Sequence, residues 1–247
     1  MPELPEVETV VRGLRLVLPG KTVAAVENAP VEALGKRIAG VQRYGKFIVI
    51  QFDDGMLFVH LGMTGQLTIS EATSKFTRAR IWLDDGVLRY DDIRKFGKLY
   101  WELTLPERGP DPLELTAQQF VTHAKGRRAR IKALLLDQKF LRGMGNIYTD
   151  EALFRAGIHP LAQAASLSRR RLELLHSSMV EVLQAAIAAG GSSISDYVDA
   201  RGEKGSFQQQ HQVYGKHGQP CPRCGSELKR ILVTQRGTTF CSACQRR

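Results

Sequence analysis

The sequence predicts an α+β protein with an N-terminal β-sandwich and flanking helices, a helical middle part, and a small cysteine-bearing β-hairpin at the C-terminus. Three observations lead to this prediction. Short runs rich in β-branched and aromatic residues fill the chain from about residue 22 to 104, and a helical pattern follows from about 116 to 200. All four cysteines lie in the last 27 residues of a 247-residue chain, which is long enough for two modest domains.

The first predicted element is a helix over residues 5–17. Its apolar residues recur at the spacing of one helical face: Val7, Val10, Val11 and Leu14. Pro5 suits the first turn of a helix, and Glu6 suits the positive end of the helix dipole. The N-terminus is therefore expected to be packed.

Six strands follow in the sequence pattern. They are KFIVIQF, MLFVHLG, GQLTIS, ARIWL, VLRYDD and GKLYWEL. Asp-Gly pairs at 54–55 and 85–86 indicate hairpin turns, and strands at this spacing favour a sandwich or barrel. The stretch 104–115 holds three prolines and is typical of a linker.

The helical middle part has four predicted segments: 117–126, 130–138, 146–157 and 168–191. Gly157 and Gly190 are expected C-caps. Residues 201–219 are polar and rich in glycine, which favours a mobile loop. No run approaches the roughly 18 apolar residues of a membrane span, and the acidic N-terminus does not resemble a signal peptide, so we expect a cytosolic protein that does not bind membranes.

The charge of the chain favours a polyanion as partner. Its formal net charge is +10 and its pI is about 9.7. Basic residues gather at 125–132 and at 201–247, and clustering of this kind suits a surface that follows phosphates. On net charge alone, a basic surface that only maintains solubility is an equal alternative.

The cysteines form two CxxC pairs, Cys221 with Cys224 and Cys241 with Cys244, separated by sixteen residues. This spacing predicts one tetrahedral structural zinc with no open position; the alternative is a redox or disulfide pair. The residues between the pairs alternate like a hairpin with its turn at 235–237. Arg236 would then lie at the tip, either as a contact residue or as a solvated turn residue.

A glycine-rich turn, Gly143-x-Gly145-Asn146, connects two predicted helices. Glycines permit close approach of a backbone, and a helix N-terminus favours phosphate. Asn146 would cap the second helix or donate to a phosphate. A purely structural helical hairpin is the alternative.

The N-terminus itself carries candidate chemistry. Removal of Met1 before proline would leave Pro2 with a free secondary amine, and an α-amine has a pKa of about 8. Such an amine is partly neutral near pH 7 and can attack the anomeric carbon of a sugar to give an iminium. Glu3 stands beside it as a candidate proton shuttle. The alternative is that these residues only cap the first helix, and the first ten residues alone do not decide between the two.

Six motifs in one order resemble the formamidopyrimidine-DNA glycosylase family of bacterial repair enzymes for oxidised purines. They are MPELPEVE, YGKFIVI, HLGMTG, DDIRKFG, GMGNIYTDE and the terminal CxxC pairs. The resemblance covers nearly the whole chain. It implies a catalytic β-sandwich domain at 1–106, a linker at 107–115, a helix–two-turn–helix DNA-binding domain at 116–212 with a lesion loop near 201–211, and a zinc finger at 213–247.

The resemblance also implies roles for single residues. Pro2 corresponds to the nucleophile and Schiff-base former, Glu3 to the acid/base and Glu6 to a supporting carboxylate. Lys46 corresponds to a lysine that contacts phosphates around the lesion, and Lys139 to one near the lesion.

Five further residues correspond to DNA contacts of the family. Met63, Arg94 and Phe96 resemble the trio that fills the gap left by the everted base, and Asn146 with Arg236 resembles the phosphate clamp. The implied activities are base excision and strand cleavage by β,δ-elimination, in a monomer that acts on damaged double-stranded DNA in the bacterial cytosol or nucleoid.

Two departures from the family pattern concern loops. The chain is shorter than typical members near 28–40 and 70–77, and KFTRAR at 75–80 replaces a stretch usually richer in histidine. Two other functions stay open. One is an endonuclease VIII-like glycosylase for oxidised pyrimidines, which usually begins PEGPE where this chain has PELPE. The other is a non-catalytic zinc-ribbon protein that binds nucleic acid.

Overall fold

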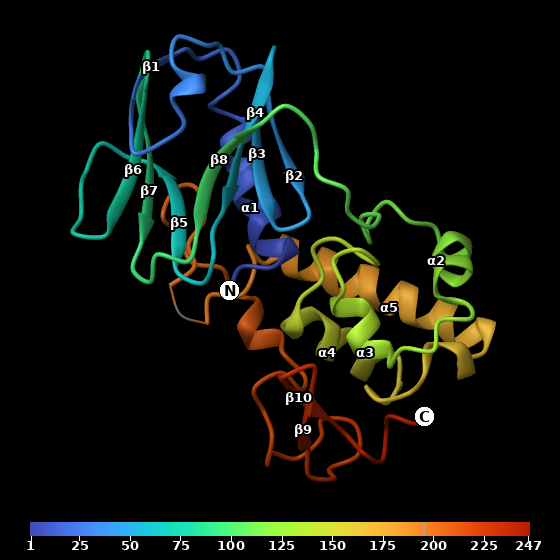
Figure 1. Ribbon diagram of the computed structural model, residues 1–247. Coiled ribbons are helices and arrows are strands. Elements are labelled where there is room, and N and C mark those ends of the chain that lie inside the picture. The colour runs from blue at the N-terminus through green and yellow to red at the C-terminus, as the bar shows by residue number, and fades with distance from the viewer. Residues whose placement is uncertain (195) are drawn as a thin grey trace. The chain divides into compact units, whose positions relative to one another are not determined.

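The computed structural model describes residues 1–194 and 196–247 and divides the chain into two compact units (Figure 1). Unit 1 comprises Met1–Pro106 and Ala186–Gln208, and unit 2 comprises Glu107–Ala185 and Gln209–Arg247. Unit 1 is thus discontinuous in sequence. The division of the chain at 106, 115 and 212 stays a prediction.

Two four-stranded antiparallel sheets form unit 1, which confirms the predicted β-sandwich (Figure 1). One sheet has the order β1-β6-β7-β5 and the other β2-β3-β4-β8. The strands are β1 (Val23–Glu27), β2 (Gly40–Tyr44), β3 (Phe47–Phe52), β4 (Gly55–His60), β5 (Gly65–Ile69), β6 (Thr77–Leu83), β7 (Gly86–Asp92) and β8 (Lys98–Glu102). A short 3₁₀ helix, η1 (Val31–Ala33), follows β1.

Helix α1 (Leu4–Arg15) packs into the core shared by the two sheets. The predicted apolar stripe is confirmed, because its four members are fully buried: Val7, Val10, Val11 and Leu14. Each such burial stabilises the fold by about 1.5–3 kcal/mol. This packing fixes the chain from Leu4 onward and so holds the residues that precede the helix.

The hairpin turns lie one residue earlier than the Asp-Gly pairs suggested. Phe52 pairs with Gly55 and Leu83 pairs with Gly86, so both glycines open a strand. The sequence pattern also missed β1 and β2. Both have partly exposed positions and lack a long apolar run.

Helices and one hairpin form unit 2. Its elements are α2 (Ala117–Ala124), α3 (Ile131–Leu136), α4 (Asn146–Arg155), η2 (Ala164–Ser166), α5 (Arg169–Ala188, whose last turn belongs to unit 1), β9 (Lys229–Val233) and β10 (Arg236–Phe240). The 3₁₀ helix η3 (Phe207–Gln210) spans the boundary at 208. Gly157 and Gly190, the expected C-caps, both have positive φ.

The hairpin turn of unit 2 differs from the prediction. Thr234 and Gln235 form the two-residue turn, with φ of 48° and 59°, and Arg236 opens β10 opposite Val233. Placing the turn at 235–237 was therefore wrong by one residue. Within the described part of the chain, no helix has the length and hydropathy needed to cross a bilayer.

Candidate active site

Met1 is exposed, whereas the next residues, from Pro2 onward, are buried and lie around the carboxylate of Glu6. Pro2 and Glu3 are both buried, and Glu3 is the residue before the first turn of α1. The N–H of Glu3 donates to Oε2 of Glu6 over 2.8 Å, and the N–H of Ser192 donates to Oε1 over 2.7 Å. Both oxygens of one buried carboxylate are thereby fixed.

The segment that returns to unit 1 supplies the second half of this support. The hydroxyl of Tyr197 donates to the carbonyl of Glu6 over 3.2 Å. Gly191 has a φ of +82°, and a Cβ there would lie 2.9 Å from Oε1 of Glu6. Only glycine fits such a position. Burial and the nearby charge of Glu6 raise the pKa of Tyr197, so its hydroxyl keeps the proton that it donates.

Lys46 lies in the tight turn between β2 and β3, next to Gly45, which has a φ of 62°. The strands pair up to Tyr44 and Phe47, so the turn is as short as a hairpin allows. The Lys46 side chain is half-buried.

Met63, Arg94 and Phe96 contact one another on the surface of unit 1. The guanidinium of Arg94 lies 3.2 Å from the sulfur of Met63 and 4.7 Å from the centre of the Phe96 ring. Phe96 is 53% exposed and Met63 is 39% exposed. Two exposed apolar side chains that flank a cation agree with the wedge that the family resemblance predicts.

A buried carboxylate, Asp92, holds the two loops that carry this trio. It accepts hydrogen bonds from the hydroxyl of Thr64 on one loop and from the N–H groups of Arg94 and Gly97 on the other. The hydroxyl of Tyr90 also donates to it. Burial raises the pKa of Asp92, but these hydrogen bonds outweigh burial and hold the pKa below its ordinary value.

Within unit 2, Asn146 contacts Gly237, which is the residue after Arg236. The side-chain amide of Asn146, in the first turn of α4, donates to the carbonyl of Gly237 over 2.9 Å. Arg236 is exposed at the start of β10, and Lys139 is exposed in the turn before α4. Asn146 is not the cap of α4, because Gly145 occupies the N-cap position.

A second buried cluster lies behind this contact. The ammonium of Lys132 lies 2.6 Å from Oδ1 of Asp150, and both side chains are almost completely buried. Burial raises the pKa of Asp150 to about 7, against the opposing effects of Lys132 and of the Thr239 N–H. The adjacent Glu151 accepts hydrogen bonds from the backbone N–H groups of Gln212, Val213 and Tyr214.

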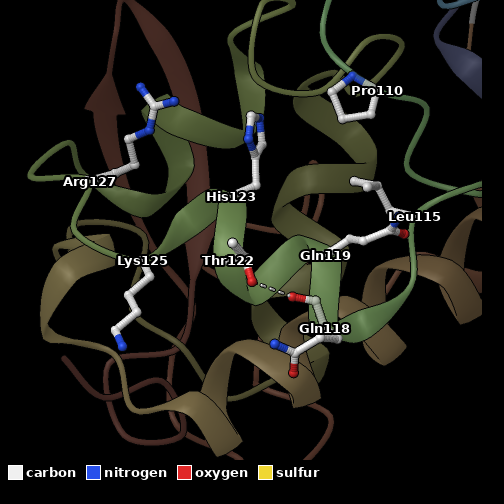
Figure 2. A pocket seen from close by; sticks show the side chains of 8 residues that line it. All are labelled: Pro110, Leu115, Gln118, Gln119, Thr122, His123, Lys125 and Arg127. Atoms are coloured by element: carbon white, nitrogen blue, oxygen red, sulfur yellow. Dashed lines mark hydrogen bonds between the residues drawn. The ribbon is translucent and has the colours of Figure 1, made fainter.

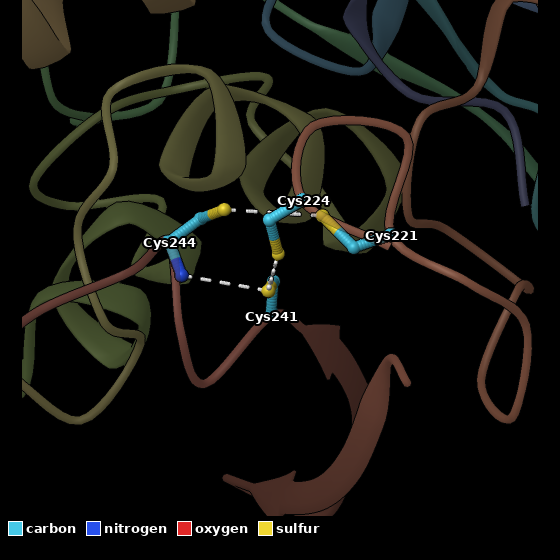
Figure 3. A group of neighbouring side chains, drawn as sticks. All are labelled: Cys221, Cys224, Cys241 and Cys244. Carbon is cyan, nitrogen blue, oxygen red and sulfur yellow. Dashed lines mark hydrogen bonds between the residues drawn. The ribbon is translucent and has the colours of Figure 1, made fainter. Parts of the chain in front are cut away.

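The four cysteine sulfurs form one cluster, with all four within 4.8 Å of one another (Figure 3). The sulfurs of Cys224 and Cys241 are 3.6 Å apart, and those of Cys221 and Cys244 are 3.9 Å apart. Four thiolates around zinc at about 2.3 Å would lie about 3.8 Å apart, whereas a disulfide needs about 2.05 Å. The donor set therefore fits the predicted structural zinc.

Family models match three consecutive parts of the chain. The formamidopyrimidine-DNA glycosylase N-terminal domain matches residues 1–99, the formamidopyrimidine-DNA glycosylase H2TH domain matches residues 108–198, and a zinc finger found in FPG and IleRS matches residues 218–247. The formamidopyrimidine-DNA glycosylase of Solibacter usitatus is 46% identical, with full coverage of both chains.

Two more relatives agree. The Bacillus subtilis formamidopyrimidine-DNA glycosylase is 41% identical over 99% of each chain. A Lactococcus lactis FPG mutant, solved in complex with a Fapy-dG containing DNA, has a TM-score of 0.90 and 38% identity, with full coverage of both chains. The chain belongs to the formamidopyrimidine-DNA glycosylase family.

Membership in the formamidopyrimidine-DNA glycosylase family makes the chain a DNA glycosylase of base excision repair with a zinc-finger module. The predicted family and zinc site are confirmed. The roles assigned to single residues stay predictions. Residues that the sequence reading missed are the supports of the predicted ones: Asp92, Asp150, Ser192 and Tyr197.

A hollow of about 620 Å³ beside α2 contains none of these residues (Figure 2). It is lined by Pro110, Leu115, Gln118, Gln119, Thr122, His123, Lys125 and Arg127. The side chains of Lys125 and Arg127 come from the basic cluster at 125–132. In a formamidopyrimidine-DNA glycosylase, a hollow lined by no predicted catalytic residue is not the candidate active site.

Proposed function

We propose that the chain is a bifunctional DNA glycosylase and abasic-site lyase that everts and excises oxidised purines, formamidopyrimidines and 8-oxoguanine, from double-stranded DNA. One observation carries the proposal. Met1 is followed by a buried proline and a buried glutamate, next to a carboxylate whose two oxygens are fixed by Glu3 and Ser192. The relatives named above support the substrate class.

The proposed nucleophile is the secondary amine of Pro2 after removal of Met1. Its lone pair attacks C1′ of the damaged nucleotide, and the bond to the base breaks, so that the base leaves with a proton. Opening of the sugar ring gives an iminium between Pro2 and C1′. This cation acidifies C2′, and successive eliminations break the bonds to the 3′ and 5′ phosphates. Hydrolysis then returns the amine.

Glu3 supplies the proton for the ring oxygen in this scheme. A buried carboxyl group beside the amine is suited to general acid–base work. Glu6 acts through Glu3, because it accepts the N–H of Glu3 and so fixes the backbone between the nucleophile and α1. Its own orientation depends on Ser192.

The remaining residues bind DNA in this proposal. Met63, Arg94 and Phe96 fill the gap left by the everted base and offset a few kcal/mol of lost stacking. Lys46 contacts phosphates around the lesion, and Asn146 with Arg236 clamps a phosphate near the N-terminus of α4.

The rest of the chain completes the proposal. Lys139 lies near the lesion, and residues 201–211 close over the everted base; Ser195 lies outside the described residues. Cys221, Cys224, Cys241 and Cys244 hold one zinc, which keeps the β9–β10 hairpin rigid. The enzyme is a monomer of the bacterial cytosol or nucleoid.

Borohydride trapping tests the proposal. Reduction during reaction with a duplex that carries one 8-oxoguanine should give a stable adduct, and proteolysis with mass spectrometry should place the sugar remnant on the Pro2 nitrogen. A remnant on Lys46 or another lysine would contradict the mechanism. A protein that only binds nucleic acid would give no adduct. Retention of Met1 is the matched control, because its amide-linked Pro2 nitrogen is not nucleophilic.

A further inference from the structure

The free edge of β10 is covered by side chains of α4. In the two-stranded sheet, β10 pairs with β9 on one side only. On the other side, the Gly237 carbonyl accepts from Asn146, and the Thr239 N–H donates to Oδ2 of Asp150 over 3.1 Å. Two backbone groups of a sheet edge, which would otherwise be unpaired, are thus satisfied by one helix.

The spacing of these two contacts matches in both elements. Asn146 and Asp150 are four residues apart on α4, a rise of about 6 Å. Gly237 and Thr239 are two residues apart on β10, a rise of about 6.6 Å. The helix and the strand therefore run in register over one turn. This register sets where Arg236, the residue before Gly237, lies relative to the first turn of α4.

Asp150 has a fixed orientation because Lys132 holds its other oxygen. Lys132 projects from α3 and is 0% exposed, and Asp150 is 2% exposed. A buried ion pair adds little net stability, but it requires both partners in a defined geometry. Glu151 anchors the segment that leads into the zinc finger, through the N–H groups of Val213 and Tyr214.

We propose that Asp150, through the oxygen that accepts the Thr239 N–H, is a positioning residue that sets the β9–β10 hairpin against α4, so that Arg236 and the N-terminus of α4 bind the same phosphate. The inference rests on the proposed phosphate contact of Arg236. Asp150 itself does not touch DNA in this arrangement. Its effect on binding passes entirely through Arg236.

A double-mutant cycle tests this in two backgrounds, in each of which residues 132 and 150 are both uncharged. Lys132→Met with Asp150→Asn removes the ion pair but keeps an oxygen for the Thr239 N–H. Lys132→Met with Asp150→Leu removes both. Each background, and the unmodified chain, is combined with Arg236→Ala, and affinity is measured for a duplex that carries an uncleavable abasic analogue. Zinc content near one per chain shows that each finger is folded.

We expect Arg236→Ala to weaken binding about ten- to a hundredfold in the unmodified chain and in the asparagine background. In the leucine background it should change affinity less than about threefold, and the slope of log K against log salt should already be smaller by about 0.9. An equal loss in both backgrounds overturns the inference. The inference is also overturned if Arg236→Ala no longer weakens binding in the asparagine background.

Failure of the proposed phosphate contact can be told apart from failure of this inference. If Arg236→Ala has no effect in the unmodified chain, the proposed phosphate contact fails. If the leucine background does not fold, hydrogen exchange in the unmodified chain decides. The Thr239 amide should exchange as slowly as the paired amides of β10, and exchange at the rate of an open edge overturns the inference.

Discussion

The carboxylate of Asp92 accepts a hydrogen bond of 2.8 Å from the backbone N–H of Gly97. The same carboxylate accepts the hydroxyl of Thr64, so one buried group connects the loop of Met63 to the loop of Arg94 and Phe96. In the proposed function Met63, Arg94 and Phe96 form a wedge between bases, and such a wedge needs parts that keep a fixed geometry. Asp92 fixes that geometry, because its buried carboxylate is hydrogen-bonded to both loops.

Asp92→Asn is expected to impair excision of a base-paired lesion more than cleavage at a pre-made abasic site. An amide offers one acceptor oxygen in place of two, so two buried donors lose part of their pairing, at a cost of about 1–3 kcal/mol in unfolding free energy. Single-turnover rates on both substrates measure the effect. Asp91→Asn, on the neighbouring residue that accepts from Thr77, is the control, and equal profiles for both variants would contradict the expectation.

Met63→Ala and Phe96→Ala should bind a pre-made abasic site nearly normally and excise a paired 8-oxoguanine about 10- to 100-fold more slowly. Their proposed work offsets unstacking, which an abasic site needs less. Rates and affinities on the two duplexes check this. Ile93→Ala, an exposed apolar residue of the same loop, is the matched control. Equal losses of rate and affinity on both duplexes would mean that Met63 and Phe96 only pack against the rest of the fold.

Glu3→Gln should lower base excision by about 10²- to 10⁴-fold and leave much of the nicking at an abasic site. The amide cannot protonate the ring oxygen of an intact nucleotide, whereas an abasic sugar is already in equilibrium with its open form. Gel assays on the two substrates give the ratio. Loss of both activities to the same degree would assign Glu3 to folding instead.

Cys224→Ser, or removal of zinc by a chelator, should abolish DNA binding while unit 1 stays folded. A zinc module gains most of its folding free energy from the metal. Metal analysis should find one zinc per unmodified chain, and near-ultraviolet spectra of the tryptophans, both in unit 1, should not change. Ser242→Ala, between the two cysteines of the other CxxC pair, is the control. Well under one zinc per folded chain would remove the metal from the protein.

His211 should make the stability of unit 2 fall as the pH is lowered from about 6.5 to about 4. Burial lowers the pKa of this imidazole to about 4, while the unfolded chain binds the proton near pH 6.5. As the pH falls, the unfolded state therefore takes up the proton first. The contribution of neutral, buried His211 to the unfolding free energy is complete above about pH 6.5 and is lost as the pH falls from there to about 4. Thermal melts of unmodified and His211→Gln protein should converge toward acid pH. Parallel curves would contradict this.

The sequence predicted elements whose signals are local. The stripe of α1, the glycine C-caps and the CxxC pairs each depend on residues within a few positions of one another or on a known ligand spacing. The contact of Ser192 with Glu6 joins residues 186 positions apart, and nothing in either local pattern indicates it. Ser192 is in no motif, and its contribution is a backbone N–H, which every residue except proline has.

Two further misses have different physical causes. A lysine is usually exposed, but Lys132 is fully buried and pairs with Asp150 on another helix. The alternating pattern between the CxxC pairs predicts the turn at 235–237, but Thr234 and Gln235 adopt the left-handed conformation instead. Hydrogen bonds from α4 to Gly237 and Thr239 require these residues in the strand.

The discontinuity of unit 1 has a consequence for the order of events on the ribosome. Pro2 and Glu6 are among the first residues to be synthesised, yet the N–H that completes the Glu6 site belongs to Ser192, which follows 186 residues later. At about 5–20 residues per second, the nascent chain exposes its N-terminus for roughly 10–40 s before that site can close. Removal of Met1 needs an accessible terminus. Because the segment Ala186–Gln208 is synthesised late, the terminus stays accessible during this interval.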